Sequence, residues 1–184
     1  MALPKLKVPE YELVVPSTQE KIKYRPFLVR EEKILLMAME SEEPNSVSNA
    51  LSTIVTECTF GNIDGETAPV FDAEYIFLQL RAKSVGETVE FILKCEECDH
   101  PMKIELDLTE VQVNQGEEVS NRIMLNDEVG VTLKPITLGN SKSLMKDETD
   151  ITSILSVVID TIFDNDGVYK SEETSQKESR KEYT

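Results

Sequence analysis

The chain has 184 residues, of which 40% are hydrophobic, and this is enough apolar material to build one ordinary folded domain. Its 35 acidic residues outnumber its 19 basic residues, so the net charge is −16 and nucleic acid would meet electrostatic repulsion. No stretch approaches the ~18 apolar residues of a membrane span, and the start lacks the apolar run of a secretory signal, so we expect a soluble protein that stays in the compartment where it is made.

The first 27 residues are predicted to form an extended arm and a hairpin. Two prolines in residues 1–9 disfavour a helix and favour an arm that a neighbouring subunit orders. The β-branched and aromatic residues of 11–15 and 21–27 indicate two strands, joined by a turn at Pro16-Ser17-Thr18.

Three helices are predicted next. Residues 31–40 begin with acidic residues, which suit the positive end of a helix dipole. Residues 45–58 place apolar side chains on one face, so Cys58 is predicted to be a small core residue. Residues 71–83 form the most apolar segment, which predicts the central packing helix.

The second half of the chain reads mainly as strands. Apolar residues alternate in 89–93 and 102–108, which predicts a second hairpin, and 123–125 with 129–133 predict a third. Apolar spacings of three and four residues predict an amphipathic helix over 151–162, with Thr149 or Asp150 as its cap.

These elements predict an α+β fold in which small antiparallel hairpins pack with about four helices. We expect one domain over residues 10–165, after the arm of residues 1–9. Residues 166–184 are predicted to be a polar tail, because they contain too few apolar side chains to bury themselves.

Cys95 and Cys98 are the one pair of residues with metal-ligand spacing, and they supply half of a tetrahedral zinc site. The other candidate ligands are His100 and Cys58, although Cys58 is predicted to lie on the apolar face of a helix. A thioredoxin-like redox role is disfavoured, because the surrounding acidic residues are expected to raise the pKa of these thiols. Three cysteines, an odd number, fit a reducing cytoplasm.

Other features that could carry chemistry have simpler interpretations. The basic residues of 21–25 alternate with Ile22 and Tyr24, which is typical of a solvated strand face rather than a nucleic-acid patch. A single histidine predicts no catalytic triad. Asp164-Asn165-Asp166-Gly167 is out of register for a calcium loop, so we expect a polar turn. Phosphate-binding and nucleophile motifs are lacking, so neither a small-molecule substrate nor a cofactor is expected.

Long segments carry a resemblance to a known family. They are LPKLKVPEYELVVPSTQEKIKYRPFLVREEKILLMAMES (3–41), FDAEYIFLQLRAKSVGE (71–87), KCEECDHPMKIELDL (94–108) and VTLKPITL (131–138). Over most of its length to about residue 165, the chain resembles the baseplate proteins of T-even-type bacteriophages, which include hub assembly proteins of contractile tails. The family pattern also leads us to expect an apolar helix and a second cysteine-containing piece beyond Thr184. The C-terminus of this chain could therefore be shortened relative to the family. A zinc site shared with that second piece would then be in doubt.

The resemblance implies a late, non-enzymatic protein of virion morphogenesis. Its partners would be other baseplate hub proteins, and it would act in the host cytoplasm as a hub component or as an assembly factor that leaves. Two alternatives stay open. The chain could be an adaptor domain stabilised by a zinc knuckle at Cys95 and Cys98, or an enzyme whose carboxylate site is hidden among its many acidic residues.

Overall fold

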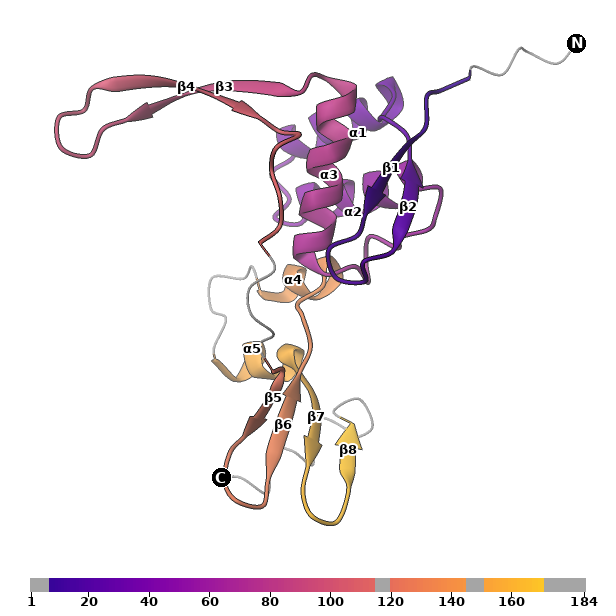
Figure 1. Cartoon of the computed structure of the whole chain (residues 1–184), viewed down its shortest axis with the longest axis vertical. Coiled ribbons are helices and arrows are strands. Elements are labelled where there is room, and N and C mark those ends of the chain that lie inside the picture. The colour runs from indigo at the N-terminus through magenta and orange to yellow at the C-terminus, as the bar shows by residue number, and fades with distance from the viewer. Residues whose placement is uncertain (1–6, 115–119, 145–150, 171–184) are drawn as a thin grey trace, which may run out of the picture. The chain divides into compact units, whose positions relative to one another are not determined.

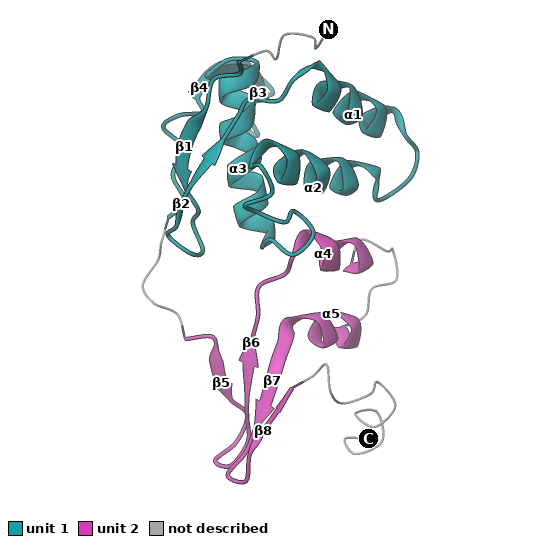
Figure 2. Cartoon of the chain, turned by 90° about the vertical axis from the view of Figure 1, so that its right-hand side faces the viewer, with its two compact units in different colours: residues 1–114 teal, residues 115–184 magenta. Residues whose placement is uncertain are grey.

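The computed structural model describes residues 7–114, 120–144 and 151–170, and Figure 1 colours them from indigo to yellow along the chain. Contacts group the chain into two compact units, residues 1–114 and residues 115–184 (Figure 2), and each unit is described by itself. Both units combine helices with antiparallel strands, so the predicted α+β class is confirmed. A single domain over residues 10–165 remains a prediction, and most of the arm of residues 1–9 lies outside the described residues.

Unit 1 begins with a hairpin of β1 (Tyr11–Val14) and β2 (Lys21–Tyr24), in which Leu13 lies opposite Ile22. Successive side chains of a strand point to opposite faces, so the apolar residues of this hairpin are buried while its lysines are exposed. The first predicted hairpin is therefore confirmed.

Three helices form the rest of the body of unit 1: α1 (Val29–Glu40), α2 (Ser46–Cys58) and α3 (Val70–Ser84). The large apolar core residues of α2 and α3 recur at intervals of three or four, which places them on one face of each helix. Fully buried core side chains of α2 and α3 include Ile54, Val55, Cys58, Ile76 and Leu80. All three predicted helices are confirmed, with ends that differ by only one or two residues.

The loop between α2 and α3 passes close against α2 at Gly65. A Cβ atom at this position would overlap the backbone of Ser52, so only glycine fits. This close approach lets the chain reverse tightly before α3.

A long hairpin extends from the C-terminal end of α3 (Figure 1). Its strands are β3 (Thr88–Lys94) and β4 (Pro101–Asp107), and nearly all of their residues are exposed or half-buried. At its base Leu108 is buried, and the N–H of Leu108 donates to the carbonyl of Glu87 at 2.8 Å, which closes the ribbon. The second predicted hairpin is confirmed as a projecting ribbon.

Unit 2 is an antiparallel four-stranded sheet with two short helices. The strand order is β5-β6-β7-β8, so the third predicted hairpin is confirmed as its first two strands. The strands are β5 (Arg122–Met124), β6 (Gly130–Leu133), β7 (Ile159–Phe163) and β8 (Val168–Lys170), and the helices are α4 (Leu138–Leu144) and α5 (Ile151–Val158).

The predicted helix over 151–162 is wrong over its last four residues, because α5 ends at Val158 and the chain continues as β7. The segment Ile159–Phe163 is rich in β-branched residues, and β6 offers it a partner strand, with Val131 opposite Ile162. Pairing with a sheet therefore overrides the helical spacing. The predicted caps at residues 149 and 150 lie outside the described residues.

Two further elements were not predicted. Helix α4 is short and contains glycine and serine, so its propensity is weak, but Thr137 Oγ1 accepts from the N–H of Asn140 at 3.2 Å and caps its first turn. Strand β8 lies inside the stretch that the sequence assigned to the polar tail. It pairs with β7 because the turn at 164–167 reverses the chain.

Candidate functional site

The turn that joins β3 to β4 contains the cysteine pair. The N–H of Cys95 donates to the carbonyl of His100 at 3.0 Å, and the N–H of Asp99 donates to the carbonyl of Cys95 at 2.9 Å. Asp99 has a φ of 55°, in the left-handed region, which closes the turn. The structure therefore places the pair at the tip of the hairpin, with Cys98 exposed and Cys95 partly exposed.

Backbone N–H groups in this turn stabilise a thiolate. The pKa of Cys95 lies below its ordinary value because the N–H of Glu97 donates to its sulfur, and the N–H and thiol of Cys98 add to this effect. The expectation that nearby acidic residues raise this pKa was wrong for Cys95, because hydrogen bonds within the turn lower its pKa. Donors of this kind could not be read from residue spacing alone.

The other two candidate ligands do not join the pair. Among the described residues, no three His, Cys, Asp or Glu side chains are grouped to hold a metal ion. Cys58 is fully buried in α2, as predicted, and His100 follows the turn without forming such a group. Zinc binding by Cys95 and Cys98 therefore remains a prediction that needs ligands from elsewhere.

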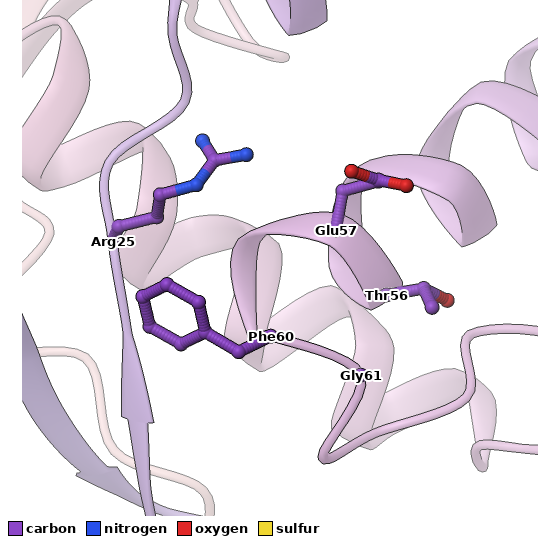
Figure 3. Close-up of a pocket in the computed structure, with 5 residues that line it drawn as sticks. All are labelled: Arg25, Thr56, Glu57, Phe60 and Gly61. Atoms are coloured by element: carbon purple, nitrogen blue, oxygen red, sulfur yellow. The ribbon is translucent and has the colours of Figure 1, made fainter. Parts of the chain in front are cut away.

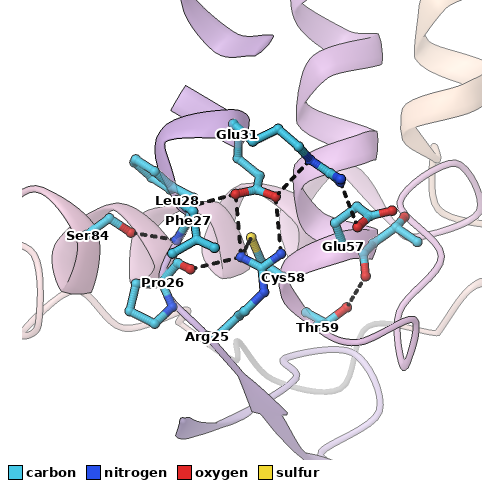
Figure 4. Close-up of polar contacts among 11 residues, drawn as sticks. Arg25, Pro26, Phe27, Leu28, Glu31, Glu57, Cys58, Thr59 and Ser84 are labelled. Atoms are coloured by element: carbon cyan, nitrogen blue, oxygen red, sulfur yellow. Dashed lines mark hydrogen bonds and ion pairs between the residues drawn. The ribbon is translucent and has the colours of Figure 1, made fainter. Parts of the chain in front are cut away.

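Cys58 belongs to a polar cluster inside unit 1, shown in Figure 4. Burial raises the pKa of Cys58 to about 11, so its thiol stays protonated at neutral pH. Arg25 Nη1 donates to its sulfur at 3.7 Å and also to the carbonyl of Pro26 at 3.1 Å. This cysteine is a poor nucleophile and a poor metal ligand.

The centre of the same cluster is an ion pair that the sequence did not reveal. Arg25 Nη2 lies 3.1 Å from Glu31 Oε1, and the N–H of Leu28 donates to Glu31 Oε2 at 2.8 Å. Burial raises the pKa of Glu31, but the hydrogen bonds from Arg25 and Leu28 lower it by more, so the pKa lies below its ordinary value. The carboxylate thus caps α1 and ties the end of β2 to it.

A surface hollow of about 440 Å³ lies beside this cluster, lined by Arg25, Thr56, Glu57, Phe60 and Gly61 (Figure 3). Its polar groups already have structural partners. Arg25 binds Glu31, Glu57 pairs with Arg30 at 3.0 Å, and Thr56 Oγ1 accepts from the N–H of Gly65 at 2.9 Å. The hollow therefore lacks a pair of groups poised for acid–base chemistry.

The basic residues of β2 are neutralised in a similar way. Lys21 pairs with Glu12 at 2.5 Å, and Lys23 pairs with Glu10 at 3.6 Å. These pairs support the interpretation of a solvated strand face.

The turn at 164–167 is also as predicted. Asp164 Oδ1 accepts from the N–H groups of Asp166 and Gly167, both at 2.8 Å. Its side chain therefore closes a polar turn.

The projecting hairpin carries several exposed apolar side chains. Directly opposed residues pair three apolar couples on one face, and the other face carries mostly charged and polar residues. The apolar couples are Val89 with Leu106, Phe91 with Ile104 and Leu93 with Met102. A two-stranded hairpin is marginally stable in water by itself, so an uncovered apolar face on such a ribbon is typical of a surface that another protein covers.

The described residues combine a ribbon with exposed apolar side chains and no assembled group of potential metal ligands. No helix in the described parts of the chain is long and apolar enough to cross a membrane. A comparison with protein-family sequence models matches residues 8–183 of the chain to the family described as T4 bacteriophage base plate protein. The chain belongs to this family, and the resemblance found in its sequence is thereby confirmed. No curated protein and no solved structure matches the chain.

Proposed function

We propose that the chain is a non-enzymatic protein of baseplate hub assembly in a contractile phage tail. It acts in the host cytoplasm by binding other hub proteins, and it uses neither nucleic acid nor a small-molecule substrate. Membership of the baseplate family supports partners of this kind. The observation that carries the proposal is the uncovered apolar face of the β3–β4 hairpin.

The hairpin suits a hub protein with an apolar patch and a basic rim. Its apolar couples present a stripe that a partner can cover, and the net charge of −16 favours a partner whose surrounding surface is basic. Charge attraction speeds the encounter, and burial of the apolar stripe then holds the complex.

The test is a double substitution on the apolar face, Phe91→Ser with Leu93→Ser. These side chains are 36% and 47% exposed. Full burial of a large apolar side chain contributes ~1.5–3 kcal/mol, so covering their exposed parts contributes roughly 1.2–2.5 kcal/mol. We expect the dissociation constant for the hub partner to rise by roughly 7- to 60-fold. Co-purification of the chain with co-expressed baseplate proteins identifies the partner, and calorimetry measures the constant.

Ile92→Ser is the matched control, because Ile92 is also apolar and exposed but points to the opposite face of the same strand. It should leave binding unchanged. Equal loss of binding in both variants, or in neither, would show that the apolar face is not the contact surface. A self-association that only the double substitution abolishes would instead identify a second copy as the occupant.

Whether the protein stays in the particle is a separate question with a direct test. We propose that mass spectrometry of purified virions will detect the chain if it is a hub component and will find it only in assembly intermediates if it is a factor that leaves. Absence from both fractions would contradict the proposed role.

A further inference from the structure

One face of the four-stranded sheet in unit 2 carries a row of basic and hydroxyl side chains. The row takes one residue from each strand, in the strand order β5-β6-β7-β8 (Figure 1): Arg122, Thr132, Thr161 and Lys170. The register pairs each member of the row directly with the next. Directly opposed residues of antiparallel strands point to the same face, so these four side chains are neighbours. We call them the cationic row.

The guanidinium of Arg122 is positioned over the sheet by an aromatic ring. Its carbon Cζ lies 3.8 Å from the centroid of the Phe163 ring. Phe163 is buried, and the edge of its ring lies over Gly130, where a Cβ atom would overlap it. Gly130 is two residues before Thr132 on β6 and therefore on the same face. Arg122 thus reaches inward from the edge strand β5 to the neighbourhood of Thr132, and a guanidinium that is already positioned loses less freedom when it binds a ligand.

The donors of the row are available to a ligand. Arg122 and Lys170 are exposed, and the two threonines are half-buried. In the part of the chain that the structure describes, neither threonine hydroxyl forms a hydrogen bond, and no carboxylate pairs with Arg122. Acidic residues outnumber basic residues by 35 to 19, so composition does not explain the missing carboxylate. A positioned guanidinium beside hydroxyl groups without partners indicates a site for an anion.

The rest of this face adds no negative charge from its paired strand residues. Besides the row, the register places on it Met124, Gly130, Phe163 and Val168. Asp160 is the extra residue where the pairing of β6 and β7 shifts, and it forms no ion pair with Arg122. Two basic side chains against one acidic side chain leave the face locally positive, although the whole chain has a net charge of −16.

We propose that the cationic row binds a phosphate dianion, either free or as the phosphate of a monoester. The guanidinium donates two parallel N–H groups, and the hydroxyls of Thr132 and Thr161 donate to further oxygens. Lys170 approaches from the opposite edge strand, since neighbouring strands are only ~4.8 Å apart. This inference concerns unit 2 and does not depend on the proposed hub role of the β3–β4 hairpin.

The number and charge of the donors favour phosphate over other anions. A phosphate monoester carries about −1.5 to −2 charges at neutral pH and three strong acceptor oxygens, which match two basic groups and additional hydroxyl donors. A carboxylate carries one charge on two oxygens, so the guanidinium alone would satisfy it. Each phosphate of a nucleic-acid backbone also carries only one charge, and the net charge of the chain repels the polymer.

The experiment titrates the full chain with sodium phosphate at neutral pH and constant ionic strength, and follows the amide resonances by NMR. We expect saturable shifts at the row, with a dissociation constant of roughly 0.1–10 mM, the range of two or three charge-assisted hydrogen bonds. Sodium acetate should bind at least about 10-fold more weakly, because it lacks the second charge. A tripeptide with a central phosphoserine distinguishes the sources: tighter binding than inorganic phosphate indicates a phosphorylated protein, and weaker binding indicates free phosphate.

Variants test whether the named side chains hold the ligand. Arg122→Gln should raise the dissociation constant for phosphate by roughly 10- to 100-fold. Thr132→Val keeps the shape but removes the hydroxyl, and it should raise the constant by roughly 2- to 10-fold. Lys94→Gln removes one positive charge from unit 1 and should leave the constant unchanged. The ring resonances of Phe163 report whether the sheet stays folded in each variant.

Three results would overturn the inference. Shifts that grow without saturation would mean that phosphate only screens surface charge. Equal affinity for acetate would mean that the row does not select a dianion. Equal weakening by Lys94→Gln and Arg122→Gln, or unchanged binding in both row variants with the sheet folded, would place the ligand elsewhere.

Discussion

Replacing Glu31 with glutamine should destabilise the protein far more than its single lost charge suggests. Glu31 is 1% exposed, and its carboxylate accepts from Arg25 at 3.1 Å and from the N–H of Leu28 at 2.8 Å. Glutamine keeps the size and one acceptor, but it leaves the guanidinium without its counter-charge. Breaking a buried ion pair costs ~3–5 kcal/mol. Since the Arg25 side chain is 14% exposed, we expect the low end, about 3 kcal/mol.

Glu57→Gln is the matched control. Glu57 pairs with Arg30 at 3.0 Å, but the two side chains are 49% and 67% exposed. Exposed pairs contribute ~0–1 kcal/mol, so this variant should stay close to the wild type. Urea unfolding followed by circular dichroism gives both free energies. If Glu31→Gln costs no more than Glu57→Gln, the buried pair does not organise the junction of β2 and α1.

The pH dependence of the same variant provides a second check. The folded pKa of Glu31 lies below the ordinary 4.5, so the stabilisation is fully present above that value. It is lost as the pH falls through the lower, folded pKa, because the carboxylate is then protonated in both states. The gap in unfolding free energy between wild type and Glu31→Gln should therefore be large at neutral pH and narrow under strongly acidic conditions. A gap that does not change with pH would refute the charge-based explanation.

Three further predictions address other parts of the chain. Gly130→Ala should lower stability by ~1–3 kcal/mol, measured by thermal unfolding, because a Cβ there would overlap the ring of Phe163. Thiol labelling of the metal-free native chain should modify two cysteines quickly and the buried Cys58 only after denaturation, and fast labelling of all three would contradict its burial. Deleting residues 1–9 should leave the circular dichroism spectrum intact but weaken co-purification with hub proteins, and unchanged co-purification would count against a partner-binding arm.

The sequence predicted the elements of this fold well wherever one local pattern was decisive. Alternation fixed the ribbon of 88–107, and helical spacing fixed α2 and α3. The prediction from sequence was wrong for residues 159–163. The apolar residues there fit the spacing of a helix and also that of a strand, and only pairing with β6 decides between the two. Local patterns cannot report which partner strand the tertiary fold supplies.

For the candidate sites, too, local patterns were predictable from the sequence and tertiary contacts were not. The Cys95–Cys98 spacing could be read directly, whereas the N–H groups that turn toward Cys95 depend on backbone angles that no residue type dictates. Glu31 was assigned to the first turn of a helix, and that was correct. Its pairing with Arg25 was missed, since a spacing of six residues between a strand and a helix has no periodic signal.

The apolar face of the β3–β4 hairpin was predicted from the sequence, but what covers this face was not. Alternation in 89–93 and 102–108 predicts one apolar face, and an apolar face in a folded protein normally points at a core. Here the face is formed as predicted, but among the described residues no helix or other strand of unit 1 packs extensively over it. A strand pattern with an apolar face that lacks a core within its own unit fits the proposal that another protein of the assembly covers this face.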